Sequence, residues 1–282
     1  MIKITAQNKY GQQIQLTGNP AIKLAQVTGL TPPPANINTS ALATKDGSIF
    51  NSSHVQNRNI VLTIYPAQKI EQTRVNLYQY FKTKQYIKLH IQTALRRVWI
   101  EGYIESIDGD LYENPQKMQV SIICPDPYFK SEDTTVVSFT NVTGELEFPI
   151  NFPAAGIEIS TLEQYSQELI YNQSDDETGV VVELYAGGTV SGITLTNETT
   201  GQSFTINQEM NEGDEIILNT RRGEKRLSLV IGGITTNIIN TMDPGSDWFT
   251  LVPGDNIFNY QCEEGAENLN VKLILQPIFE GV

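Results

Sequence analysis

The chain has few of the residues on which many active sites and covalent frameworks depend. Its 282 residues include only two cysteines, two histidines and two tryptophans. Two cysteines are too few for a disulfide framework, and Cys124 and Cys262 do not form a CxxC pair. Charged residues make up 18% of the sequence, whereas glycine, asparagine, threonine and β-branched residues are plentiful. This composition favours strands and turns over helices.

Long apolar segments are also missing. The N-terminal segment MIKITAQNKYGQ lacks the apolar core of a signal peptide, so we expect synthesis and retention in a cytoplasm. The most apolar run, residues 227–234, is interrupted by Ser228 and two glycines. A helix that spans a membrane needs about 20 apolar residues. The sequence therefore predicts no association with a membrane.

Enzyme signatures are not found either. The sequence has no G-x-S-x-G elbow, HExxH pair, P-loop or GxGxxG motif. His54 is expected in the polar loop NSSHVQN, and His90 alternates onto the polar face of an expected strand. Asp108, Asp110 and Glu113 could bind Ca²⁺ weakly, but hairpin turns favour the same residue types. We therefore expect no enzymatic activity, no cofactor and no metal site.

Charge changes sign near the middle of the chain. Residues 1–130 contain 14 Lys/Arg and 8 Asp/Glu, a net charge of +6, whereas residues 131–282 contain 5 and 24, a net charge of −19. A change of this size indicates two modules with different surfaces. We therefore predict an N-terminal domain of residues 1–130 and a C-terminal domain of residues 131–282.

The segment CPDPYF at this boundary has three possible interpretations: a reactive thiol, half of a metal site, or a rigid joint. In the preceding strand Met118, Val120 and Ile122 share a face with Cys124, which predicts a small buried hydrophobic residue there. Each proline fixes its own φ and extends the preceding residue. We therefore predict a structural joint between the domains, formed by Cys124, Pro125, Asp126, Pro127, Tyr128 and Phe129.

The first half mixes strands with one helix. The apolar alternation predicts strands over residues 59–65, 86–92, 97–105 and 118–124, and a hairpin of residues 13–17 and 21–27 around Gly18-Asn19-Pro20. Pro66 is expected to open a helix with Ile70, Leu77, Tyr78 and Phe81 along one side. The segment TPPPANINT should prevent regular structure for several residues. The long connection up to Arg58 is expected to reach a neighbouring subunit.

The second half consists of strands throughout. Strands are predicted at 179–186, 203–208, 214–219, 225–231, 234–240, 255–261 and 268–276. Short strands at this spacing indicate a β-sandwich. The fold class is thus mainly β: an N-terminal α+β domain with one helix and an N-terminal hairpin, followed by a β-sandwich.

Several stretches resemble one protein family. They are YIKLHIQTALRRVWIEGYIESIDGDLYENPQKMQVSIICPDPYF at residues 86–129, DEIILNTRRGEKRLSL at 214–229, and WFTLVPGDNIFNYQ with LNVKLILQPIFEGV at 248–261 and 269–282. In this order they are similar to the distal tail proteins (Dit) of siphophages. The resemblance covers nearly the whole chain, but residues 1–58 and 160–178 match poorly.

The resemblance implies a structural protein of the phage tail tip, made in the cytoplasm of the bacterial host. Family members form a homohexameric ring, a baseplate hub whose N-terminal domains surround the channel and whose galectin-like C-terminal domains project outward. The implied partners are the tail tube protein, a tail-associated tip protein, and receptor-binding or other baseplate proteins. DNA can pass through the channel, but no sequence-specific binding of nucleic acid is implied.

Carbohydrate binding by the C-terminal domain is the alternative function, because the implied fold is that of galectins. Trp248 is the only tryptophan in this half, which has no histidine and lacks the galectin motif His-x-Asn-Pro-Arg. We expect Trp248 to pack in the core or in a turn rather than to stack on a sugar.

Overall fold

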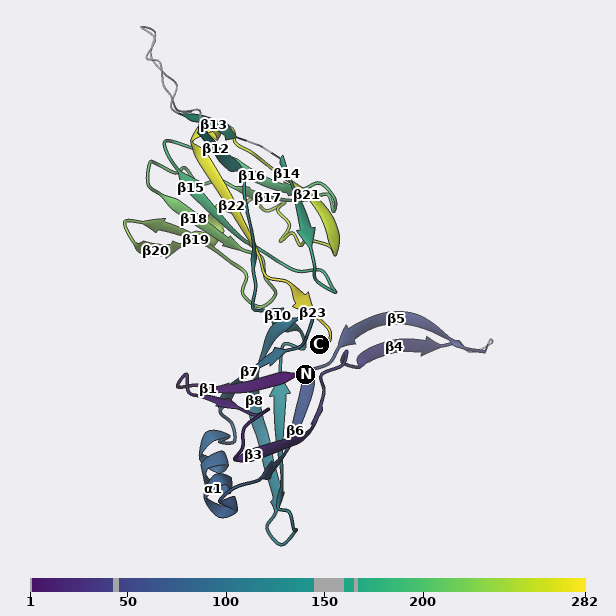
Figure 1. Ribbon diagram of the computed structural model, residues 1–282. Coiled ribbons are helices and arrows are strands. Elements are labelled where there is room, and N and C mark those ends of the chain that lie inside the picture. The colour runs from purple at the N-terminus through teal and green to yellow at the C-terminus, as the bar shows by residue number, and fades with distance from the viewer. Residues whose placement is uncertain (1, 43–45, 145–159, 165–166) are drawn as a thin grey trace. The chain divides into compact units, whose positions relative to one another are not determined.

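The computed structural model describes residues 2–42, 46–144, 160–164 and 167–282. The chain divides into two compact units. Unit 1 comprises Met1–Asp133 together with Ile278–Val282, and unit 2 comprises Thr134–Pro277. Most described residues lie in strands, so the fold is mainly β as predicted (Figure 1).

Unit 1 is built on one sheet and one helix. Its elements are β1 (Lys3–Asn8), β2 (Gln13–Gln15), β3 (Ile22–Thr28), β4 (Ala35–Ala41), β5 (Ser48–Val55), β6 (Arg58–Pro66), α1 (Ile70–Tyr80), β7 (Tyr86–Gln92), β8 (Arg97–Asp110), β9 (Lys117–Cys124), β10 (Phe129–Ser131) and β23 (Ile278–Phe279). The main sheet has the order β2-β1-β7-β8-β9-β6-β3, and β10 pairs with both β8 and β23.

Alternation of apolar residues explains which face of this sheet is buried. Met118, Val120, Ile122 and Cys124 of β9 are all at most 2% exposed, whereas the residues between them are partly exposed. The strands β7, β8 and β6 contribute their alternate apolar residues to the same core cluster. The predicted role of Cys124 as a small buried hydrophobic residue is therefore confirmed.

The helix is shorter than predicted. Pro66 ends β6 instead of opening the helix, and α1 begins at Ile70 after Lys69, whose φ is 44°. Leu77 and Phe81 are buried as expected, whereas Ile70 is exposed. A proline suits the end of this strand because it has no N–H that must join the ladder.

The predicted N-terminal hairpin is wrong in its pairing. β2 pairs with β1, whereas β3 pairs with β6 on the far side of the sheet. β1 was not predicted. Its residues Ile4 and Ala6 are buried, and the strand pairs with β2 on one side and β7 on the other. Nor does TPPPANINT stay irregular: β4 starts directly after its last proline and pairs with β5.

Unit 2 is a sandwich of two antiparallel sheets. Its elements are β11 (Thr135–Ser138), β12 (Thr140–Gly144), β13 (Ser160–Gln164), β14 (Gln167–Asn172), β15 (Val181–Ala186), β16 (Ile193–Asn197), β17 (Gln202–Ile206), β18 (Glu215–Asn219), β19 (Arg226–Ile231), β20 (Ile234–Asn237), the 3₁₀ turns η1 (Ile239–Thr241) and η2 (Ala266–Asn268), β21 (Gly254–Gln261) and β22 (Leu269–Leu275). The sheet orders are β11-β22-β15-β18-β19-β20 and β14-β21-β16-β17.

One apolar core fills the space between these sheets. Leu269, Val271, Leu273 and Leu275 of β22 point into it as predicted. Trp248 is half-buried at its margin, with its ring 5.1 Å from that of Phe204 in an edge-on arrangement. Trp248 thus packs against the core as expected. The sequence missed β11 to β14 and β16.

The division of the chain differs from the predicted boundary at two points. Residues 131–133 remain in unit 1, and the last residues, 278–282, return to it. The reason is strand pairing: Phe129 of β10 pairs with Phe279 of β23, and Lys130 pairs with Ile278. Unit 2 is therefore an insertion between β10 and β23.

Candidate functional site

Arg58, the first residue of β6, packs against the segment predicted as a joint and pairs with its first residue, Cys124. Its side chain is buried, with only 2% of the residue exposed. The guanidinium lies over the aromatic ring of Phe129, and Cζ of Arg58 is 4.4 Å from the centroid of that ring. A buried guanidinium must satisfy its donors, because an unpaired polar group in the interior costs free energy.

Four main-chain carbonyl groups accept these donors. Nε donates to Pro127 at 2.6 Å, and Nη2 donates to Glu280 at 2.5 Å. Nη1 donates to Gly29 at 2.6 Å and to Thr31 at 2.7 Å. We call Arg58 and these four carbonyl groups the arginine clasp. It joins three segments of unit 1 that are far apart in sequence.

Charges and burial act in opposite directions on this site. Burial lowers the pKa of Arg58, whereas the neighbouring Cys124 and Glu280 raise it. Burial also raises the pKa of the Cys124 thiol to about 12, although Arg58 opposes this shift. A thiol with so high a pKa carries almost no thiolate at neutral pH and is a poor nucleophile. Neither the reactive-thiol nor the metal interpretation of Cys124 is favoured.

The returning C-terminal segment has a second arginine. Arg96 donates from Nη1 to the carbonyl oxygen of Gly281 at 2.6 Å, and its Cζ lies 4.1 Å from the centre of the Phe279 ring. The amide of Val282 donates to the carbonyl of Leu30 at 3.2 Å. Residues 278–282 are therefore held by a strand pair, two arginines and one further main-chain bond.

Side chains also fix the segment that leaves unit 1 after β10. His90 Nδ1 lies 2.7 Å from a carboxylate oxygen of Glu132, and Arg97 Nη2 lies 2.7 Å from one of Asp133. The amide of Glu132 donates to the carbonyl of Arg97 at 2.9 Å. These bonds attach the exit segment to β7 and β8 up to its last residue in unit 1.

The structure thus places the six predicted joint residues inside unit 1. Pro127, Tyr128 and Phe129 are buried, whereas Pro125 and Asp126 are exposed. Their role as a joint stays a proposal, and its physical basis shifts from stiff prolines to anchoring by Arg58. Nothing in the sequence around Arg58 distinguishes it from the scattered surface lysines and arginines, so sequence reasoning missed it.

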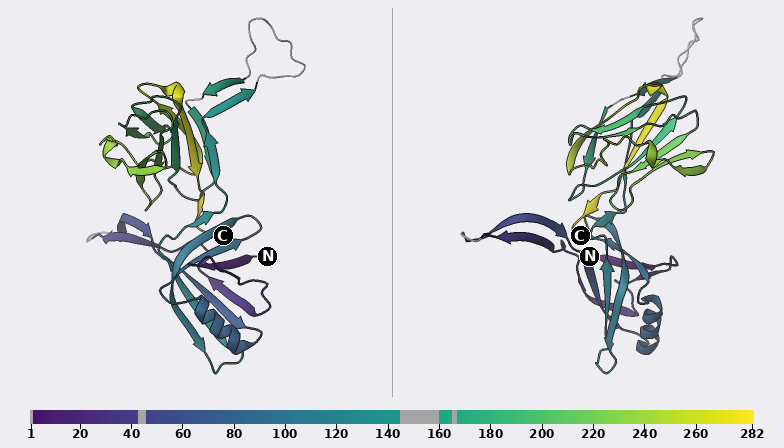
Figure 2. Two further views of the ribbon diagram at one scale, coloured as in Figure 1. Left: turned by 90° about the vertical axis from the view of Figure 1, so that its left-hand side faces the viewer. Right: turned by 180° about the vertical axis from the view of Figure 1, so that it is seen from behind.

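A second feature is the β4–β5 hairpin, which pairs with no other strand of the described chain. Figure 2 shows it extending away from the main sheet of unit 1. Ile37 is 62% exposed and Phe50 is 61% exposed. An isolated two-stranded hairpin is only marginally stable in water, so an extended one usually has a partner.

The strand register places most of the apolar side chains of the hairpin on one face. Ala35, Ile37 and Thr39 share this face with their partners Val55, Ser53 and Phe50. We call its four apolar residues, Ala35, Ile37, Phe50 and Val55, the apolar stripe. The opposite face is polar apart from Ile49, and its Asn38 donates to Ser52 Oγ at 3.0 Å. β4 and β5 contain no Lys, Arg, Asp or Glu.

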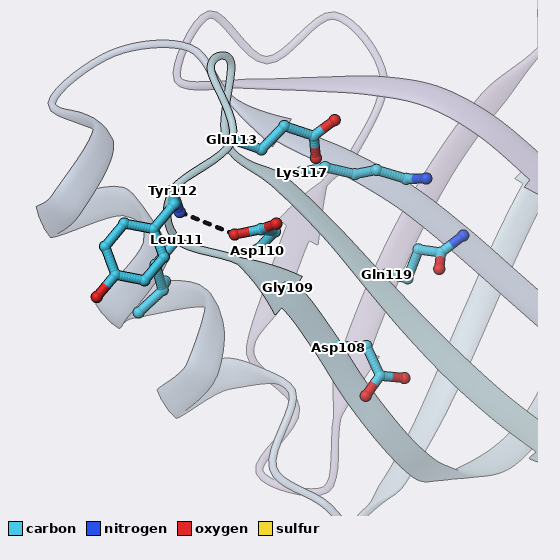
Figure 3. A pocket seen from close by; sticks show the side chains of 8 residues that line it. All are labelled: Asp108, Gly109, Asp110, Leu111, Tyr112, Glu113, Lys117 and Gln119. Atoms are coloured by element: carbon cyan, nitrogen blue, oxygen red, sulfur yellow. Dashed lines mark hydrogen bonds between the residues drawn. The ribbon is translucent and has the colours of Figure 1, made fainter.

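The tip of the β8–β9 hairpin has an open hollow of about 620 Å³ that contains the expected acidic residues (Figure 3). Asp110 accepts a hydrogen bond from the Tyr112 amide at 2.9 Å, and Asp108 accepts one from Ser106 Oγ at 3.0 Å. These bonds favour a turn-building role. In the described parts of the chain, no three His, Cys, Asp or Glu residues are placed to hold a metal ion.

The two histidines lie in different sheets of unit 1. His54 lies in β5 rather than in a loop, and His90 lies on the polar face of β7 as predicted. Within the described residues, no helix is both long enough and apolar enough to cross a membrane.

Comparisons with known proteins agree with this architecture. Residues 173–273 match the family described as "Siphovirus-type tail component, C-terminal domain". This match makes residues 173–273 similar to the C-terminal domain of siphovirus-type tail components. The resemblance to distal tail proteins noted from the sequence is confirmed.

Solved structures extend the likeness to the whole chain. The Dit protein (gp 19.1) of phage SPP1 aligns with a TM-score of 0.68 and 12% identity, over 98% of this chain and 99% of that one. A chain of the phage P2 baseplate, in its activated conformation with Ca, aligns with a TM-score of 0.54 and 10% identity over 100% of both chains. At these identities the likeness shows a shared fold. No curated protein sequence matches this chain.

Proposed function

We propose that the protein is a structural, non-enzymatic hub of a siphophage tail tip. Six copies form a ring that joins the tail tube to the tail-associated tip protein and to receptor-binding or other baseplate proteins. The match to a tail-component domain and the shared Dit fold support this role. Unit 1 closes the ring, and unit 2, with a galectin-like fold, faces the peripheral partners.

The observation that carries the proposal is the uncovered apolar stripe. Ile37 and Phe50 are largely exposed and Val55 is partly exposed, and exposed apolar surface of this kind marks interaction sites. In a cyclic ring each subunit presents one surface to the next copy and receives a different surface from the previous copy. The hairpin is the presenting element, and burial of the stripe against the next copy stabilises the ring.

The test is a deletion confined to the hairpin. Residues 35–55 are replaced by a short Gly/Ser linker in the full chain, which keeps Arg58 and the main sheet. We expect hexamers of the wild-type chain and monomers of the variant by light scattering and electron microscopy, with the thermal unfolding of both units retained. A matched control replaces Asn36, Asn38 and Ser40 of the polar face by threonine and should leave the rings intact. Hexamers of the deletion variant would refute the proposed role of the hairpin.

Carbohydrate binding receives no support from Trp248, because its ring packs on Phe204 and the Lys225 ammonium lies 5.5 Å from its centre. These two contacts reduce the area of the Trp248 ring on which a sugar could stack.

A further inference from the structure

The turn between β1 and β2 presents an aromatic side chain to solvent. Tyr10 lies at this turn and is 71% exposed. The Lys9 ammonium lies 4.9 Å from the centre of its ring. This aromatic ring is available to a partner, and aromatic residues are enriched among those that dominate interfaces.

Hydrogen bonds fix the backbone of this turn. Asn8 Oδ1 accepts from the amides of Tyr10 at 3.0 Å and Gln12 at 3.1 Å. The Asn8 amide donates to the carbonyl of Gln12 at 3.0 Å, and the Gly11 amide donates to the carbonyl of Asn8 at 2.9 Å. The hydroxyl of Tyr80, at the end of α1, donates to the carbonyl of Gln12 at 2.8 Å. The turn is therefore rigid although its tip is exposed.

Rigid presentation matters for binding. A side chain on an ordered backbone loses less conformational entropy when a partner covers it, so its contact contributes more to affinity. Tyrosine adds a large contact area with few rotatable bonds and is enriched among the residues that dominate interfaces. Tyr10 has the chemistry of an anchor residue for an uncharged, apolar partner surface.

The position of the turn in unit 1 indicates which partner this is. β2 and β3 lie at opposite ends of the main sheet, and the β4–β5 hairpin follows β3. Figures 1 and 2 show the hairpin and the β1–β2 turn leaving unit 1 on opposite sides. In a ring with head-to-tail contacts, the side that presents the hairpin of one copy meets the opposite side of the next.

We propose that Tyr10 anchors the apolar stripe of the neighbouring copy. This inference rests on the proposed ring and names the surface that receives the hairpin. The stripe suits an aromatic anchor because its strands carry no charge that would lose hydration in the contact.

The first experiment compares two exposed tyrosines in the full chain. Tyr10→Ala should raise the protein concentration at which rings form at least tenfold, because removal of an interface anchor weakens each contact by at least that factor. Tyr112→Ala is the matched control: Tyr112 is 99% exposed at the tip of the β8–β9 hairpin and should leave assembly unchanged. Equal thermal midpoints of both variants and the wild type show that the fold is kept.

The second experiment identifies the occupant. In a Cys262→Ser background, a Tyr10→Cys chain is mixed with a Phe50→Cys chain and oxidised. A disulfide between the two chains supports the contact, and the same mixture with Tyr112→Cys should give none. Cys124 is fully buried and does not interfere.

The possible failures are distinguishable. A wild-type chain that stays monomeric at every concentration overturns the proposed ring and this inference with it. Normal rings from Tyr10→Ala overturn the inference alone and leave the ring in place. Weakened rings without the disulfide overturn the assignment of the apolar stripe as the occupant.

Discussion

Replacement of Arg58 by methionine tests whether the arginine clasp holds unit 1 together. Methionine keeps the apolar length of the side chain but removes all four bonds to the carbonyl groups of Gly29, Thr31, Pro127 and Glu280. Hydrogen bonds to a charged group contribute roughly 1.5–3 kcal/mol each. Burial of the guanidinium offsets part of this sum, since Arg58 loses its hydration in the folded state.

Arg58→Met leaves four carbonyl groups without this partner, and an unsatisfied buried acceptor costs about 1–3 kcal/mol. With the cost of burying the guanidinium set against this sum, the net loss is about 3–5 kcal/mol. We expect a loss of this size for Arg58→Met. For a domain of this length, it corresponds to a fall in the thermal midpoint of roughly 10–20 °C. Arg58→Lys should lie between the two proteins, because an ammonium keeps the charge but not the planar fork that reaches three segments.

The chain carries its own reporters for this assay. Trp99 lies in unit 1 and Trp248 in unit 2, so a Trp248→Phe background isolates the fluorescence of unit 1 during unfolding by urea or heat. Arg97→Met serves as the control, since its ion pair with Asp133 is exposed and should affect the midpoint little. A loss below about 1 kcal/mol for Arg58→Met would refute the role of the clasp, given the magnitudes above.

Two further predictions concern neighbours of the clasp. Burial raises the pKa of Cys124 from its ordinary 9.0 to about 12. The stability that its neutral thiol contributes is therefore complete below pH 9 and is lost as the pH rises from there to about 12. In Cys124→Ala, the free energy of urea unfolding of unit 1 should fall less steeply over this range, by up to ~1.4 kcal/mol per pH unit. Gly102→Ala should destabilise unit 1 by about 1–3 kcal/mol in the same assay, since its new Cβ would lie 2.7 Å from the carbonyl oxygen of Ile123 and 2.9 Å from Cys124 Sγ; an unchanged midpoint would contradict this overpacking.

Strands with a buried face were predictable from the sequence because their apolar residues alternate. β7 was predicted with its observed bounds, and β9 was predicted to within one residue. The alternation is weak in β4 and β5, since Ala35 is small, Ile49 lies on the opposite face, and every residue except Val55 is exposed. A strand without a face buried in its own chain shows little contrast between core and solvent, so local patterns do not reveal it.

Pairing between strands that are distant in the chain was harder to predict from the sequence. The segment around Gly18-Asn19-Pro20 has the composition of a hairpin turn, yet β2 and β3 lie at opposite ends of the sheet. Their partners are chosen by the burial of Leu16, Ile22 and the neighbouring strands, which depends on the whole sheet. The clasp is invisible for a similar reason: Arg58 and Glu280 are 222 residues apart in sequence.

The arginine clasp connects Arg58 to the main-chain segments that lead into the β4–β5 hairpin, into unit 2 and back from unit 2. Gly29 and Thr31 precede the β4–β5 hairpin, Pro127 precedes the exit to unit 2, and Glu280 follows the return from it. Gly29 itself has a φ of 82°, and a Cβ there would lie 2.1 Å from the carbonyl oxygen of Asn59, so glycine is required where this segment crosses β6. In the proposed ring the hairpin closes the assembly and unit 2 meets the peripheral partners. Both elements then start from main-chain segments bound to the same guanidinium, which couples the stability of ring closure to that of the attachment of unit 2.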